Sequence, residues 1–199
     1  MAKAIFLSAS VPDPKRSPKY DDTADSVAIS SAVSALVHVI LGRRLLVWGG
    51  HPATTPMIWF IAENIGVDYG KCVHLYQSNH FSDHFPEDNR RFQNVTYTDD
   101  IENDRDKSLT LMRQRMFKSH SFSAAVFIGG MDGILEEFDL FRQLQPNADV
   151  VPVVSTGGAT IDLAERLKDH ESYLEKDFDY ISVFHQRLKI GFDEERNQI

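Results

Sequence analysis

The stretch AAVFIGGMDGILEE, residues 124–137, decides the fold. It begins with a run of apolar residues at 124–128, passes through a glycine-rich turn at 129–133, and continues with the apolar spacing of a helix. A continuous apolar run is typical of a strand in a parallel sheet that is covered by helices on both faces. The stretch therefore predicts one strand–turn–helix unit of an α/β protein.

The same unit recurs along the chain, because short apolar runs alternate with longer segments of helical period. We expect strands at 4–10, 44–48, 72–77, 95–98, 124–128 and 150–155. We expect helices at 23–41, 53–65, 102–119, 133–144 and 159–169, with Asp22 or Thr23 at the start of the first and Gly42 and Gly66 ending the first two. The fold class that follows is α/β: a single doubly wound, Rossmann-like parallel sheet of about six strands with helices on both faces.

Length and composition narrow the function class. The 199 residues, 42% of them hydrophobic, suit one core, and the formal charge of −8 argues against a nucleic-acid partner. Cys72 is the single cysteine, so no intramolecular disulfide is possible and a reducing compartment is expected. No stretch reaches the roughly 18 apolar residues of a membrane span, and no secretory signal is recognisable. We expect a cytoplasmic protein with no membrane contact.

The end of the chain differs from the rest. Residues 1–170 form the expected ligand-binding domain, whereas 171–199 hold many aromatic and aliphatic residues, among them Tyr173, Phe178, Tyr180 and Phe184. Such residues are unfavourable in a free tail. We expect a C-terminal helical extension that docks on the domain or builds an oligomer contact.

Small turns follow four of the expected strands, at the edge where open α/β sheets bind ligands. Glycine lets main-chain N–H groups approach an anion, and the following helix adds its positive dipole end. The alternative is that glycine serves only the geometry of a tight turn. The turns are Ser8-Ala9-Ser10, Gly49-Gly50-His51, Gly129-Gly130-Met131-Asp132-Gly133 and Thr156-Gly157-Gly158.

Arg113 falls on an apolar helix face. At about 100° per residue it shares that face with Leu109, Met112 and Met116, whereas Arg115 points away. A guanidinium in such a place needs an anionic partner. The partner is either a structural carboxylate or a ligand phosphate.

Glu136 and Glu137 lie in the first turns of the helix that follows 129–133. Carboxylates there favour the helix dipole, which is the simplest explanation. A carboxylate beside an anion-binding turn would alternatively contact a ribose hydroxyl or act as an acid or base. The two side chains point about 100° apart, so we expect only one to face the site.

Other side chains give weaker signals. His80 and His84 flank Asp83, but a third well-spaced ligand is missing, so we expect no metal and no cofactor. Cys72 lies inside an expected strand and is interpreted as a buried, inert thiol.

Several of these motifs resemble the SLOG superfamily, the Rossmann-like group that includes the lonely-guy phosphoribohydrolases and the DNA-processing protein DprA. Residues 128–137 look like the phosphoribohydrolase signature Pro-Gly-Gly-x-Gly-Thr-x-x-Glu. Trp48-Gly49-Gly50-His51 is similar to its Tyr-Gly-Gly-Gly turn, and Ser8-Ala9-Ser10 to its Gly-Ser-Ser turn. The resemblance spans about residues 4–168 in element order. It implies that Arg113 and Glu137 correspond to that branch's catalytic arginine and glutamate.

The departures from the signature point to another branch. Ile128 replaces proline, Asp132 is an extra residue and Ile134 replaces threonine. The chain therefore looks nearer the SLOG domains of bacterial conflict and antiviral systems, which sense nucleotide-derived signals. The resemblance implies a homo-oligomeric sensor for a cyclic nucleotide or an ADP-ribose derivative, with a separate effector protein.

In that interpretation Arg113 and the amides around 129–133 and 157–158 hold phosphate. Ser8 and Ser10 line the site, and Glu137 contacts ribose. The alternative is an enzyme, a phosphoribohydrolase or N-glycosidase that cleaves nucleoside monophosphates with Arg113 and Glu137 as catalytic residues.

Overall fold

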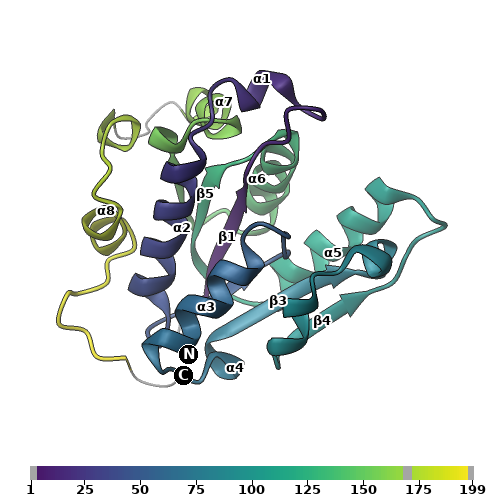
Figure 1. The fold of residues 1–199 in the computed structure, drawn as a ribbon, viewed down its shortest axis with the longest axis horizontal. Helices are drawn as coiled ribbons and strands as arrows, with labels where there is room; N and C mark the ends of the chain where they lie inside the picture. Colours follow the sequence, from purple (N-terminus) through teal and green to yellow (C-terminus); the bar gives the residue numbers. More distant parts are fainter. Residues whose placement is uncertain (1–3, 168–171, 197–199) are drawn as a thin grey trace.

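Six parallel strands form one sheet in the computed structural model, which describes residues 4–167 and 172–196. The strands lie in the order β4-β3-β2-β1-β5-β6, so the six-strand α/β prediction is confirmed (Figure 1). Expected and observed bounds differ by at most a few residues. The strands are β1 Ala4–Ser10, β2 Leu45–Trp48, β3 Val73–Ser78, β4 Val95–Thr98, β5 Phe122–Gly129 and β6 Asp149–Val153.

Helices follow the strands as the apolar spacing predicts, and short additional helices lie between them. The expected five are α2 Ser26–Ile40, α3 Thr55–Ile65, α5 Arg105–Ser119, α6 Asp132–Leu144 and α7 Ala159–Arg166. Further α-helices are α1 Pro18–Asp21, α4 Tyr69–Cys72 and, after α7, α8 Tyr180–Arg187, and short 3-10 helices lie at Asn79–His84, Glu87–Arg91, Val154–Thr156 and Ser172–Glu175. Within the described residues, no helix combines the length and the apolar character that crossing a bilayer requires.

The start of α2 corrects one expectation. The N-cap is Asp25, whose carboxylate accepts hydrogen bonds from the N–H groups of Val27 at 2.9 Å and Ala28 at 3.0 Å. Asp22 and Thr23 lie earlier in the chain, between the end of α1 and the N-cap of α2. Both carry side chains that can cap, so local sequence does not separate them from Asp25.

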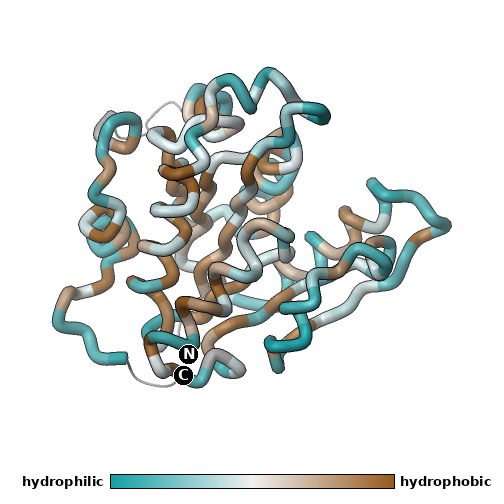
Figure 2. The backbone as a smooth tube through the Cα atoms, in the orientation of Figure 1, coloured by the Kyte–Doolittle hydropathy of each residue, from teal (hydrophilic) through white to brown (hydrophobic). Residues whose placement is uncertain are grey.

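Both faces of the sheet are covered, which explains the continuous apolar runs. Ile5 and Leu7 of β1 pack with α2 and α3, whereas Phe6, between them, packs with α5, α6 and α7. Phe6 contacts Phe117 of α5 edge to face and stacks on Phe141 of α6, with ring centroids 4.8 and 5.6 Å apart. Figure 2 shows the apolar residues concentrated along the central strands and α2.

The described part of the C-terminal extension lies on the same core. Helix α8 packs against α2, on the side away from the sheet (Figure 1). Tyr180, Val183 and Phe184 are buried in that contact. Residues 168–171 and 197–199 of the expected extension and its junction lie outside the described residues.

The winding direction reverses between β1 and β5. From β1 the chain builds β2, β3 and β4 towards one edge, and then returns to place β5 and β6 on the other side of β1. Ser10 pairs with Gly129 in register at the carboxyl ends of these two strands. This reversal is the place where doubly wound sheets open a crevice for ligands.

Candidate functional site

Four side chains meet beneath the reversal point, and we call them the arginine cluster: Ser8 of β1, Arg113 of α5, and Glu136 and Glu137 of α6. The Ser8 hydroxyl donates to Glu137 Oε2 at 2.5 Å. Arg113 donates from Nε to Glu137 Oε1 at 3.3 Å and from Nη1 to Glu136 Oε2 at 2.7 Å. Its Nη2 donates to the carbonyl of Gly133 at 3.3 Å. Segments more than 100 residues apart in sequence thus converge at one place.

Arg113 is buried, as its helix face predicts, with only 8% of its side chain exposed. Burial by itself would lower the pKa of Arg113, but the charge of Glu137 and the hydrogen bond that Arg113 donates to Glu136 raise the pKa above its ordinary value. The guanidinium therefore stays charged. Its partners are two structural carboxylates, one of the two alternatives that the sequence left open.

The two glutamates differ in exposure. Glu137 keeps 17% of its side chain exposed and Glu136 keeps 60%. The expectation that only one of them faces the site is wrong, because both carboxylates reach Arg113. A flexible glutamate spans the angle between neighbouring helix positions when a buried cation attracts it.

Several glycine amides are already used inside the protein. The N–H of Gly129 donates to Thr156 Oγ1 at 2.9 Å, and that of Gly130 donates to the carbonyl of Ser10 at 2.8 Å. The N–H of Gly157 donates to the carbonyl of Val154 at 2.9 Å. The expectation that the amides around 129–133 and 157–158 hold phosphate is therefore wrong for Gly129, Gly130 and Gly157. The amides in the first turn of α6, at Asp132 and Gly133, have no partner within the helix and remain the ones that suit an anion.

Thr156, Gly157 and Gly158 brace two loops against each other. All three are buried, and both glycines have positive φ, 69° and 64°. A Cβ on Gly157 would lie 1.9 Å from the carbonyl oxygen of Thr23, and one on Gly158 would lie 2.8 Å from that of Gly130. For these residues the structure favours turn geometry over the expected ligand contact.

A family comparison agrees with the motifs that form this site. The model of the SLOG cluster3 family matches residues 19–188. The chain belongs to the SLOG cluster3 family. Searches of curated proteins and of solved structures found no match. Membership of SLOG confirms the predicted superfamily and indicates a function related to nucleotides.

The second glycine turn of this SLOG protein, at Gly49, lies beside the cluster. A Cβ on Gly49 would lie 3.2 Å from Cε of Met112, which precedes Arg113 on α5. His51 accepts a hydrogen bond from the N–H of Ala53 at Nδ1, which places its proton on Nε2. Burial, and then the charge of Arg16, lower the pKa of His51, so this ring is neutral at pH 7. No local pattern singles out Arg16, which lies in the loop after β1.

Asp132 is held by the segment between β1 and α2, residues 11–25, which we call the strap. The hydroxyl of Tyr20 in α1 donates to Asp132 at 2.9 Å and to Asp162 of α7 at 3.1 Å, and Lys19 donates to Asp162 at 2.6 Å. Burial, and then these two carboxylates, raise the pKa of Tyr20 well above its ordinary value. The extra residue in the SLOG signature thus anchors the loop between β1 and α2. Tyr20 carries no local pattern that would have revealed this contact.

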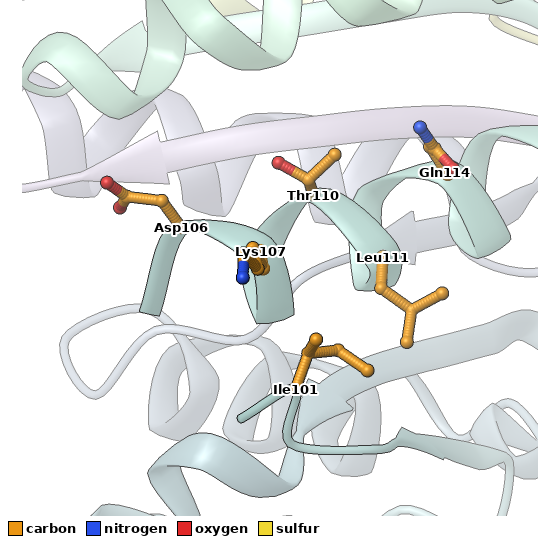
Figure 3. A pocket seen from close by; sticks show the side chains of 6 residues that line it. All are labelled: Ile101, Asp106, Lys107, Thr110, Leu111 and Gln114. Atoms are coloured by element: carbon orange, nitrogen blue, oxygen red, sulfur yellow. The ribbon is translucent and has the colours of Figure 1, made fainter. Parts of the chain in front are cut away.

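The remaining sequence candidates lie apart from the cluster. His80 pairs with Asp100 at 2.9 Å, and within the described residues no three metal-ligating side chains gather in one place. Cys72 is buried. An open hollow of about 470 Å³ on the outer side of α5 contains none of the expected site residues (Figure 3). It is lined by Ile101, Asp106, Lys107, Thr110, Leu111 and Gln114.

Proposed function

We propose that this SLOG protein binds a nucleotide-derived signal at the carboxyl ends of β1 and β5 and acts as a sensor domain. The observation that carries the proposal is the contact of Ser8, Arg113 and Glu137 at the reversal point of the sheet. Doubly wound sheets bind ligands at this place. Family membership supports a nucleotide as the ligand class.

The start of α6 offers two kinds of polar group that a nucleotide needs. The N–H groups of its first turn and its dipole suit a phosphate. One turn later, Glu137 offers carboxylate oxygens, which accept hydrogen bonds from ribose hydroxyls but repel phosphate. We therefore assign the phosphate to the Asp132–Gly133 amides and the ribose to Glu137 and Ser8.

Glu137 is held in place from two sides. One oxygen accepts from Ser8 and the other from Arg113, so the carboxylate is a fixed acceptor whose remaining lone pairs suit a ribose hydroxyl. A hydrolase remains a second candidate because Arg113 and Glu137, the residues that the phosphoribohydrolase resemblance pairs, are in contact.

Binding and turnover separate the two candidates. The purified protein is heated with AMP, cyclic AMP or ADP-ribose, and a ligand at about 100 times its Kd should raise the free energy of unfolding by about 2.7 kcal/mol. Glu137→Gln should reduce this stabilisation, whereas Glu165→Gln, an exposed charge-matched control on α7, should not. Mass spectrometry of small molecules that co-purify with the protein tests the ligand class directly.

The same samples, incubated with nucleoside monophosphates and NAD, are assayed for free base. Steady base release that Glu137→Gln abolishes would establish the hydrolase. No stabilisation by any nucleotide, together with no co-purifying ligand, would overturn the proposal.

A sensor must pass its state to another protein surface. We propose that this chain acts as a homo-oligomer and signals to a separate effector, in keeping with a role in bacterial antiviral defence. Light scattering of the protein with and without nucleotide measures the first part. A monomer at all concentrations would contradict it.

A further inference from the structure

Arg113 carries one positive charge but contacts two carboxylates. Glu137 is largely buried and also accepts from Ser8, so it is fixed from two sides. Glu136 is 60% exposed and holds Arg113 by one hydrogen bond of 2.7 Å. The second carboxylate is therefore more than charge neutrality requires.

The two carboxylates differ in how easily they can leave. Removing Glu137 would leave a buried cation without its fixed partner, which is strongly unfavourable. Glu136 can turn into water, because its carboxylate is 60% exposed and Glu137 continues to neutralise Arg113 when Glu136 leaves. Arg113 thus has one permanent partner and one exchangeable partner.

The exchangeable position suits a phosphate. A guanidinium presents several N–H donors in a plane and binds phosphate oxygens in pairs. Nη1, the atom that Glu136 contacts, and Nη2, which donates to the carbonyl of Gly133, are the two terminal nitrogens of Arg113. Gly133 also lies in the first turn of α6, so Arg113 and the amides of that turn adjoin.

We propose that Glu136 occupies an anion subsite on Arg113 and is displaced from it by the phosphate of a nucleotide. This inference rests on the proposed function and specifies how the same site is regulated. Glu136 competes with the ligand's phosphate, so it sets a threshold concentration for binding. A neutral nucleoside does not displace Glu136, because only an anion can replace it on Arg113.

The test compares Glu136→Gln with the unchanged protein by titration calorimetry, using AMP, adenosine and inorganic phosphate as probes. Glutamine keeps the shape of the side chain and removes the competing charge. Binding of AMP and of phosphate should tighten about fivefold, the size of one partly exposed ion pair, while adenosine binding stays unchanged. Glu165→Gln removes the same charge from α7 and should change none of the three.

Each other outcome has a clear meaning. Weaker AMP binding by Glu136→Gln would overturn the inference, since Glu136 would then assist the ligand. Equal changes for AMP and adenosine would overturn it too, because a general effect on the fold does not discriminate charge. If the unchanged protein binds AMP and the variant binds it equally well, only the competition fails. If neither binds AMP or phosphate, the subsite fails, and the nucleotide panel and co-purified ligands then decide the proposed function separately.

Discussion

Arg113 is placed by α5 beside Met112 and Met116, where water cannot solvate its charge. Helix geometry fixes that direction, and the two glutamates of α6 supply the compensating charge. Burying an ion pair does not by itself stabilise a protein, but removing one partner of such a pair is costly. The same residue therefore contributes to stability and to the candidate site.

Replacing Arg113 by methionine should lower the free energy of unfolding by about 3 kcal/mol, because Glu137 is then left without its cation. Urea denaturation measures the change. Arg115→Met, on the exposed side of the same helix, should change it by less than about 0.5 kcal/mol. Adding Glu137→Gln to Arg113→Met should recover part of the loss, since the two residues are coupled. Equal effects at 113 and 115 would contradict the structure.

At the scale of elements, the first N–H groups of a helix need hydrogen-bond acceptors from outside the helix. Side chains on a strand can also link it to the elements beside it. Asp25 and Asp104 cap α2 and α5 through two backbone amides each. His74 joins β3 to two neighbouring elements. It hydrogen-bonds His120, just after α5, at 3.0 Å and Thr96 of β4 at 2.8 Å, and its ring stacks on Tyr76.

Asp25→Ala should destabilise the protein by about 1 kcal/mol, the usual effect of losing an N-cap. Asp22→Ala should change stability by less than about 0.5 kcal/mol, because Asp22 caps no helix start. Thermal unfolding of the two variants gives the comparison. A larger effect at Asp22 would move the helix start back to the position that the sequence suggested.

His74 should make stability depend on pH. Burial and then the neighbouring His120 lower the pKa of His74 from 6.5 to about 4. The unfolded chain therefore binds the proton more readily than the folded protein does. The contribution of neutral His74 to the free energy of unfolding is complete above about pH 6.5 and is lost as the pH falls towards 4. The loss amounts to at most about 3 kcal/mol. Urea denaturation between pH 4 and 7 should show a shallower decline for His74→Gln than for the unchanged protein, and parallel declines would refute the linkage.

At the scale of the whole molecule, the candidate site depends on loops from distant parts of the chain that touch through their backbones. The N–H of Ala159 donates to the carbonyl of Gly130 at 3.0 Å, and Gly158 lies against the same carbonyl. Tyr20 adds a side-chain link from the strap to α6 and α7. Loops packed this closely leave no room for a methyl group.

Two glycines with positive φ contrast an open helix end with a crowded turn, because ψ is 27° at Gly66 and −148° at Gly158, where the backbone conformation is one that only glycine adopts readily. Gly66 has φ of 73° and ends α3, and a Cβ there would meet nothing within 4 Å. Gly66→Ala should cost about 1 kcal/mol, from backbone strain alone. Gly158→Ala should cost about 3 kcal/mol or more and should also weaken nucleotide binding, because the added methyl would push the 129–133 turn. Equal losses of unfolding free energy for the two variants would contradict this, because they would show that the loop at Gly158 can move away from the 129–133 turn without destabilising the protein.

The sequence alone determined the order and type of the elements, since each depends on local periodicity. Six apolar runs became six strands, and glycine turns followed several of them. The helix face of Arg113 and the SLOG motifs were also legible, because they need only spacing along the chain. These features lead to the correct fold and the correct superfamily.

The partners of these residues were decided only by the tertiary structure. Spacing showed that Arg113 needs an anion, but not that Glu136 and Glu137 both supply it. It showed glycine turns, but not that the amides of Gly129 and Gly130 are already bonded inside the protein. It gave no sign of Tyr20 beside Asp132. Local pattern sets which way a side chain points, whereas its partner depends on which distant segment the packed sheet brings within hydrogen-bond distance.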